Sequence, residues 1–288
     1  MSLFIESIGF GLITAAVLAL AAVGFTLQFA VTNVLNLAYG GVMIVAAYAA
    51  YAVNQAGVSV WIGAIASVAA GALLSLFLNT VVYRPFQRRG SAPIALVIVS
   101  LGMTLILVFG TQAIAGPTNV SYTMNQGATL KAGSFQLTVA QVAMIALSVV
   151  MMGLVHVLIR YTRLGKAMRA TAANRNLARN CGIRTDRVVT ITWLLTGALC
   201  GLAGAVFGMN SGTFGATSTD VFLVLILAAV FLGGPGEPYG AMLGALIIGL
   251  ATEVSAAFIV SDYKYVVAFV ILLTMLAVRP TGLLGARI

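Results

Sequence analysis

The stretch RYTRLGKAMRATAANRNLARNCGIRTDR, residues 160–187, decides how the chain is arranged. It contains a single acid, Asp186, no proline and eight of the fifteen lysine and arginine residues: Arg160, Arg163, Lys166, Arg169, Arg175, Arg179, Arg184 and Arg187. The sequence on both sides is apolar enough to cross a membrane, and membrane proteins keep such basic loops in the cytoplasm. We therefore expect residues 160–187 to fix the topology and to offer a docking surface to a cytosolic partner.

The composition excludes an ordinary soluble protein. The chain has 288 residues, of which 61% are hydrophobic and only 7% charged, whereas a soluble domain has about a quarter of its residues charged. The net charge of +9 comes from short loops between apolar runs, which indicates membrane topology rather than a nucleic-acid partner. The first apolar run has no basic segment before it and no cleavage site, so we expect it to be a retained span.

Nine apolar runs approach the roughly 20 residues that a spanning helix needs. They are residues 8–30, 36–54, 58–82, 93–115, 137–159, 188–209, 220–233, 239–257 and 264–279. No polar stretch reaches thirty residues. We expect an all-α polytopic membrane protein with eight or nine transmembrane helices, in which residues 1–288 form a single transmembrane domain.

The positions of the other basic residues agree with this topology. Five of the other seven follow the third and the last apolar run: Arg84, Arg88 and Arg89, then Arg279 and Arg287. All basic loops lie in the cytoplasm if residues 116–136 and 210–219, which are nearly uncharged, lie outside. Nine spans would place the N-terminus outside and eight would place it inside, and the sequence leaves both open.

Small residues mark the faces on which helices are expected to pack. Gly197, Gly201, Gly204 and Gly208 recur at i, i+4, i+7 and i+11 and so share one helix face. Helices in lipid associate through close backbone approach, which glycine permits. We interpret this row as a packing seam without chemistry, and we interpret a second row, at residues 236, 240 and 244, in the same way.

The densest set of polar residues at membrane depth lies in LQFAVTNVLNLAYGG, residues 27–41. We take its members as a candidate substrate pathway: Gln28, Asn33, Asn36, Tyr39, Gly40 and Gly41. The two asparagines would share a helix face if the segment is helical, and the glycine pair would then loosen the backbone. A broken helix whose carbonyls line a water-filled path fits this composition. Hydrogen bonding of the amides between helices fits it equally well.

Two acids near the C-terminal spans have open roles. Glu253 lies about 20 Å along its span from Gly240, nearer the outer face, and either lines the path or pairs with Lys264, with pairing favoured. Glu237 lies in LGGPGEPYG, residues 232–240, which we expect to be a tight turn because its prolines and glycines cannot continue a helix. We expect Glu237 to be solvated and the only histidine, His156, to be structural.

The sequence carries no recognisable catalytic constellation. One histidine and six scattered acids do not form a triad, and no set has the spacing of metal ligands. Gly165-Lys166 is followed by Ala167, with Arg160 at the position of the first glycine of a P-loop. We therefore expect a transporter or channel without a cofactor or ATPase site of its own. The large basic loop suggests energy from a separate subunit, and a self-sufficient channel or carrier is the alternative.

Three segments carry a resemblance over nearly the whole chain: VLNLAYGGVMIVAAYAAY (34–51), GKAMRATAANRNLARNCGIRTDRV (165–188) and VRPTGLLG (278–285). The chain resembles the LIV-type permeases, the membrane subunits of ABC importers for branched-chain amino acids, and is most similar to the shorter of the two permease types. The resemblance implies a type II-like importer fold in the bacterial inner membrane. It also implies a second, usually different, permease subunit, an extracytoplasmic binding protein, and two cytoplasmic ATPases that bind the ATP and magnesium.

The resemblance also implies a coupling helix that docks the ATPase. By carry-over it is one helix from Ala172 to Ile183, ended by Gly182. The residues concerned are Arg169, Ala172, Ala173, Asn174, Asn176, Ala178, Gly182 and Ile183. Many members have His-Gly-Glu where this chain has Tyr-Gly-Gly at 39–41. The substrate therefore stays open between branched-chain or other small amino acids, urea or short amides, and another small solute.

Overall fold

The computed structural model describes residues 2–124, 127–132, 135–258, 263–279 and 281–285, so Arg287 lies outside the described residues. Most of them are helical. The elements are α1 (Ser2–Thr32), α2 (Tyr39–Gln55), α3 (Val60–Phe77), η1 (Leu78–Tyr83), α4 (Arg84–Arg88), α5 (Pro93–Ala115), β1 (Thr129–Ala132), β2 (Phe135–Thr138), α6 (Val139–Tyr161), α7 (Arg163–Ala173), α8 (Arg175–Asn180), α9 (Thr185–Ser211), α10 (Ser218–Gly233), α11 (Pro238–Ala256) and α12 (Lys264–Val278).

Each of the nine apolar runs coincides with a helix, which confirms an all-α polytopic membrane protein. In the described part of the chain, six helical stretches are long and apolar enough to cross a membrane: Ser7–Thr32, Val60–Arg88, Pro93–Ala115, Val139–Tyr161, Thr185–Ser211 and Pro238–Ala256. The helices α2, α10 and α12 have 17, 16 and 15 residues, fewer than the roughly 20 that a straight span requires. The count of eight or nine spans therefore stays a prediction.

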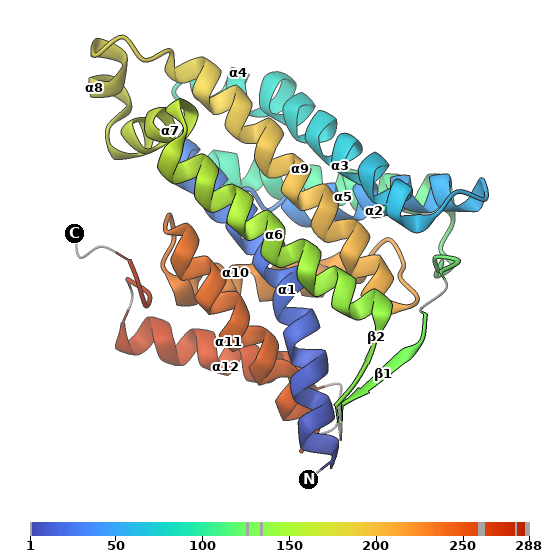
Figure 1. Ribbon diagram of the computed structural model, residues 1–288. Coiled ribbons are helices and arrows are strands. Elements are labelled where there is room, and N and C mark those ends of the chain that lie inside the picture. Colours follow the sequence, from blue (N-terminus) through green and yellow to red (C-terminus); the bar gives the residue numbers. More distant parts are fainter. Residues whose placement is uncertain (1, 125–126, 133–134, 259–262, 280, 286–288) are drawn as a thin grey trace.

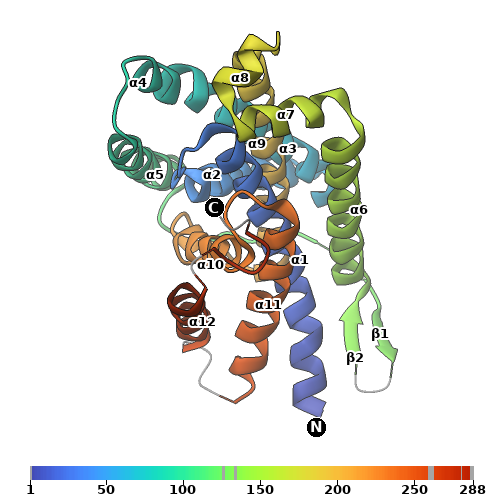
Figure 2. The ribbon, with the colours of Figure 1, turned by 90° about the vertical axis from the view of Figure 1, so that its left-hand side faces the viewer.

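The long helices α1, α6 and α9 run side by side, and α1 lies between α6 and α11 (Figures 1 and 2). The helices α4, α7 and α8 gather at one end of this bundle, which we call the basic end. The hairpin β1–β2 and the start of α1 lie at the other, which we call the hairpin end (Figure 1). The basic loops are thus collected on one side, as the charge pattern requires.

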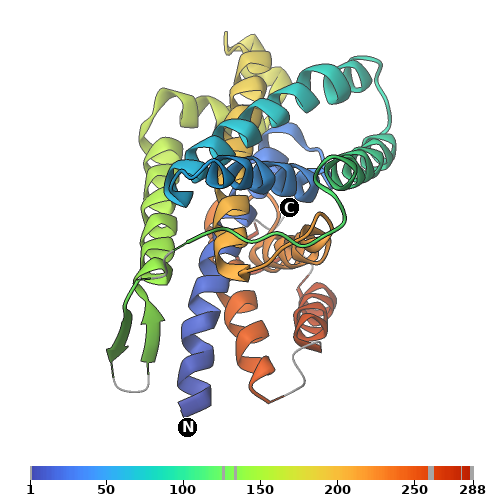
Figure 3. The ribbon, with the colours of Figure 1, turned by 90° about the vertical axis from the view of Figure 1, so that its right-hand side faces the viewer.

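An extended connection from α5 to the hairpin crosses the hairpin end (Figure 3). Within it, Val120 pairs with Phe214 through both backbone hydrogen bonds, at 2.9 Å each. The hydroxyl of Tyr122 donates to the carbonyl oxygen of Ala47 at 2.9 Å, and burial raises the pKa of this phenol, so it stays a donor. The pairing of Val120 with Phe214 brings parts of the two weakly charged loops, residues 116–124 and 212–217, to the same side of the molecule.

The glycines of α9 lie against the backbones of their neighbours. A side chain at Gly197 or Gly201 would collide with α3, since Gly201 lies against the carbonyl oxygen of Ser67. The Ser67 hydroxyl donates to the carbonyl oxygen of Gly201 at 2.6 Å. Gly204 faces the carbonyl of Met43 in α2, while Gly208 faces aromatic rings at the hairpin end. This close approach is how helices pack in lipid.

The second glycine row divides between two roles. The glycines at 240 and 244 face the backbone of α10 at Gly233 and Ala229. Gly236 instead lies in the turn 234–237, with φ +92°, and makes no such approach. The C-terminal segment covers this turn, because the backbone N–H groups of Leu283 and Leu284 donate to the last carbonyls of α10.

Candidate functional site

The polar segment 27–41 contains a real break between helices, at residues 33–38. Asn33 has φ +51°, alone among the non-glycine residues of the described ranges, and asparagine is one of the few residues that tolerates this region. The Thr32 hydroxyl donates to the carbonyl of Gln28 at 2.7 Å and accepts from the N–H of Val34 at 3.3 Å. The second of these bonds gives the N–H of Val34, just past the end of α1, a partner.

The two asparagines would share a helix face only in a helical segment, and the chain leaves the helix at Asn33. The Asn33 side chain is exposed, whereas Asn36 is buried. The Asn36 amide oxygen accepts a 2.6 Å hydrogen bond from the hydroxyl of Tyr83, at the end of η1. The ring of Tyr83 packs on that of Trp193 in α9, with 4.9 Å between centroids. A hydrogen bond between helices thus fixes the break, and neither sequence reading named Tyr83.

Gly40 and Gly41 do not loosen the backbone, which corrects a sequence-based expectation. They lie in the first turn of α2, after the break, where their missing side chains allow close packing. A Cβ at Gly40 would lie 3.2 Å from Leu223 of α10, and one at Gly41 would lie 2.9 Å from Leu107 of α5. The break in the helix lies at residues 33–38 instead, before the glycine pair.

The start of α2 is held against the middle of α9. The Tyr39 hydroxyl donates to the carbonyl of Thr196 at 3.4 Å, and the Cys200 thiol donates to the carbonyl of Tyr39 at 3.3 Å. Gln28 is 1% exposed and both of its amide atoms lack a partner within the described residues. A buried unpaired amide is costly in a membrane, so this position marks where a second polar group or a water belongs.

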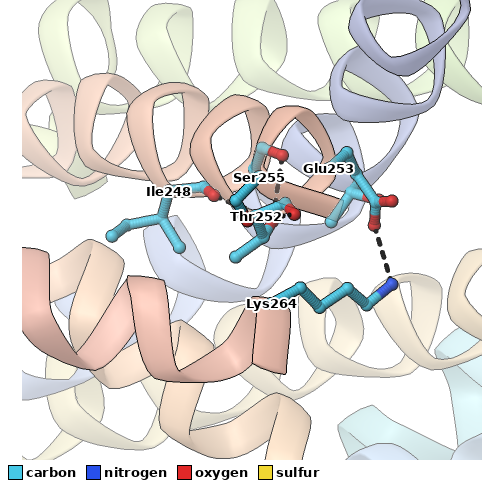
Figure 4. A network of polar contacts seen from close by, with 7 residues as sticks. Ile248, Thr252, Glu253, Ser255 and Lys264 are labelled. Atoms are coloured by element: carbon cyan, nitrogen blue, oxygen red, sulfur yellow. Dashed lines mark hydrogen bonds and ion pairs between the residues drawn. The ribbon is translucent and has the colours of Figure 1, made fainter. Parts of the chain in front are cut away.

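Glu253 lies apart from this set. Its Oε1 atom accepts from the ammonium of Lys264 at 3.1 Å (Figure 4). It also accepts from the hydroxyl of Thr14 at 3.1 Å. Thr14 precedes Gln28 by 14 residues on α1, or roughly 21 Å of helix rise. The favoured pairing with Lys264 is what the structure has, and Glu253 is not brought together with residues 28–41.

The segment proposed as one coupling helix is two helices, which corrects the expectation of a single helix from 172 to 183. Asn174 is extended, with φ −159° and ψ 105°, and its side-chain oxygen accepts from the N–H of Leu177 at 3.0 Å. Asparagine is a strong N-cap residue, so it starts α8 directly after the end of α7. Gly182 ends α8 at φ +84°, where the N–H groups of Gly182 and Ile183 donate to the carbonyls of Arg179 and Ala178. This is a Schellman motif.

Only some of the coupling residues are available to a partner. Arg169, Ala172, Ala173, Asn174, Asn176 and Gly182 are exposed. Ala178 is buried and Ile183 partly buried. Leu177 in α8 is 60% exposed. It was not predicted as a coupling residue, because a single leucine in a basic loop gives no signal in the sequence. Asp186 pairs with Arg175 at 3.1 Å and Arg179 at 3.7 Å, so these two arginines are engaged within the chain.

His156 shares a 2.9 Å hydrogen bond with the hydroxyl of Tyr239 through its Nδ1 atom. It joins α6 to the start of α11, near the basic end. No group of three histidine, cysteine, aspartate or glutamate side chains that could hold a metal ion occurs in the described ranges.

Comparison with known proteins gives the family. Residues 7–276 match the family model described as "Branched-chain amino acid transport system / permease component". The chain is 29% identical to the high-affinity branched-chain amino acid transport system permease protein LivH of Salmonella typhimurium, over 98% of this chain and 96% of the relative. It is 27% identical to the corresponding permease protein BraD of Pseudomonas aeruginosa, with the same coverage. The galactofuranose transporter permease protein YtfT of Escherichia coli is 28% identical, over 92% of this chain and 77% of the relative.

No solved structure matches the chain. The family model covers nearly all of the sequence, and the apolar helices with their basic end agree with it. The chain belongs to the family of permease components of branched-chain amino acid transport systems.

Proposed function

We propose that the chain is the membrane-spanning subunit of an ATP-driven importer and that it works by alternating access. Its substrate is a branched-chain or other small amino acid, as the names of its relatives suggest. A second permease subunit completes the pore, an extracytoplasmic binding protein delivers the substrate, and two ATPase subunits bind ATP and magnesium. The chain itself needs no ATPase site. We propose eight or nine membrane crossings in the bacterial inner membrane, with the basic end in the cytoplasm.

The observation that carries this proposal is the α7–α8 segment. It stands at the basic end, outside the spanning helices, and contacts α1 and α9. The exposed small residues at 172–174 form a shallow surface beside the exposed apolar side chain of Leu177. Such a surface fits a groove on an ATPase, and motion of α7–α8 would pass to the two long helices beneath it. The exposed Arg169 is available to acidic residues of the partner.

Ala173→Trp tests this docking surface. Residue 173 is exposed, so the variant is expected to insert and fold normally but to lose most of the substrate-stimulated ATP hydrolysis of the assembled transporter in liposomes. The control is Ala92→Trp, the same change at an exposed position of the basic end outside α7–α8. Equal hydrolysis by the two variants would move the coupling surface elsewhere.

A self-sufficient channel or carrier makes the opposite prediction for the isolated chain. If the purified chain moved solute in liposomes without ATP, the importer proposal would fail. The substrate itself is best identified by the ligand that the partner binding protein retains. If that protein retained urea, a short amide or a sugar in place of an amino acid, the importer proposal would stand and the proposed substrate would change.

We further propose that residues 28–41, at the break between α1 and α2, border the substrate path. The unpaired amide of Gln28 and the broken backbone at 33–38 support this. Uptake by the assembled importer is expected to fall more in Asn36→Leu than in Glu237→Gln, since Glu237 is a partly exposed residue of the turn before α11. The reverse order would place the path away from the break.

A further inference from the structure

A basic cleft of about 360 Å³ opens at the basic end, between the η1–α4 segment and α8–α9. Its lining includes six polar side chains that matter here: Asn79, Arg84, Arg88, Arg175, Arg179 and Asp186. Its volume lies in the range of sites that hold a small molecule. No residue of the segment 28–41 lines it, whereas Arg175, Asn176 and Arg179 of α8 do.

The charges that line the cleft do not cancel. Asp186 is the single acid among four arginines, and its carboxylate is already engaged by Arg175 and Arg179. Arg84 and Arg88 have no acidic partner in the described chain. The Nε atom of Arg175 is buried and makes no hydrogen bond there. The lining thus has three positive charges in excess, and it offers planar guanidinium donors suited to phosphate.

A buried amide completes the cleft. Asn79 is 2% exposed and lines it, and its side chain makes no hydrogen bond with any other residue that the structure describes. Its position is in η1, a π-helical turn that ends at Tyr83, two residues before Pro85. Proline cannot follow regular helix without a clash with the carbonyl four residues earlier, so the wider turn accommodates it. The turn leaves Asn79 beside the arginines, where its amide can donate to a ligand that fills the cleft.

The helices that border the cleft also expose apolar side chains outside it. Leu194 lies one turn along α9 from Thr190, a lining residue, and is 38% exposed. Leu73 and Phe77, on the outer face of α3 before Asn79, are 64% and 51% exposed. A ligand that fills the cleft and continues along these helices needs a negatively charged head and a hydrocarbon tail. Basic pockets between membrane helices bind the headgroups of anionic lipids for this reason.

We propose that the basic cleft binds the phosphate headgroup of an anionic phospholipid, with its acyl chains lying along α3 and α9. A free phosphate would satisfy the arginines but not the apolar surroundings. A carboxylate of the ATPase would leave both Asn79 and the apolar surface unused. The site depends only on this chain and not on the transport function proposed above.

Native mass spectrometry of the full chain in a neutral detergent tests the site, with phosphatidylglycerol as the probe and phosphatidylcholine as the neutral lipid. Arg84→Gln/Arg88→Gln removes two charges from the cleft without touching α7–α8. Each basic residue near an anionic surface contributes roughly fivefold to binding, so we expect an about 30-fold loss of phosphatidylglycerol affinity. The control is Arg89→Gln/Arg163→Gln, the same charge change at two exposed positions that do not line the cleft.

The proposal would be supported if the wild-type chain and the control variant strongly retained one phosphatidylglycerol and the cleft variant lost it. Equal loss in both double variants would overturn it, because net charge alone would then explain binding. Competition by millimolar inorganic phosphate as effective as that by phosphatidylglycerol would identify a free-phosphate site instead. Unchanged lipid affinity with weakened ATPase binding in the cleft variant would assign the cleft to the ATPase interface.

Discussion

The hydrogen bond between Tyr83 and Asn36 is the contact that fixes the broken segment, and Tyr83→Phe removes it with little change in shape. The donor and acceptor are 2.6 Å apart and both side chains are buried, at 0% and 2% exposure. Hydrogen bonds between helices in membranes contribute about 0.6 kcal/mol on average and at most about 1.7. A short and fully buried bond belongs in the upper part of this range. Tyr83→Phe also leaves the amide oxygen of Asn36 unpaired, so we expect a loss of about 1–2 kcal/mol of unfolding free energy.

A double-mutant cycle separates the bond from other effects of the substitutions. The assay is the unfolding of the purified chain in mixed micelles with increasing denaturing detergent, for Tyr83→Phe, Asn36→Leu and the double variant. We expect the two changes to be less than additive, with a coupling energy of about 1 kcal/mol. Thr80→Val is the control, because the Thr80 hydroxyl is exposed and donates only to carbonyls of its own helix. A coupling energy within about 0.3 kcal/mol of zero, as independent sites give, would refute the reasoning.

Three further outcomes follow from single side chains. Gly201→Leu should abolish stable folding, because a side chain there collides with the backbone of α3. Gly110→Leu on α5 is the control: it should keep the wild-type melting temperature in detergent, since its side chain meets open space. Glu253→Gln should lower the unfolding free energy by about 1 kcal/mol, since Lys264 loses its charged partner in a partly buried pair. Substrate uptake should change little. A large uptake defect with normal stability would instead place Glu253 in the substrate path. Leu177→Asp should weaken co-purification of the ATPase with the permease at least tenfold without altering the melting temperature, and normal co-purification would exclude Leu177 from that interface.

The helices themselves were predictable because hydropathy is a local property. Each apolar run found its helix, and the boundaries at Pro93 and Gly116 follow from residues that start and end helices. The packing of the row from Gly197 to Gly208 also follows from spacing alone, since i, i+4 residues share a face whatever the neighbour is. The partner of each glycine did not follow, because α3 lies more than a hundred residues away in sequence from α9.

The features that were predicted incorrectly depend on the backbone conformation of single residues, and their neighbours in the fold determine that conformation. Asn174 is compatible with a continuous helix, and only its cap bond to Leu177 shows that α7 and α8 are separate. The glycine pair at 40–41 would suit a hinge, but the left-handed conformation of Asn33 places the break earlier. Glycine in a tightly packed turn and glycine in a loose one look alike in sequence. The distinction comes from the neighbours, here Leu223 and Leu107.

The basic end and the broken segment are joined by a short series of contacts. Asp186 connects α8 to the first turn of α9 through its pairs with Arg175 and Arg179. Seven residues further along α9, Trp193 packs on Tyr83, which donates to Asn36 in the break. A shift of α8 would therefore reach the break through α9 and two side chains. Because contact alone does not establish coupling, the series is tested by a specific prediction. Tyr83→Phe should reduce substrate-stimulated ATP hydrolysis even at a temperature where the variant is fully folded, whereas Thr80→Val, one turn away, should not.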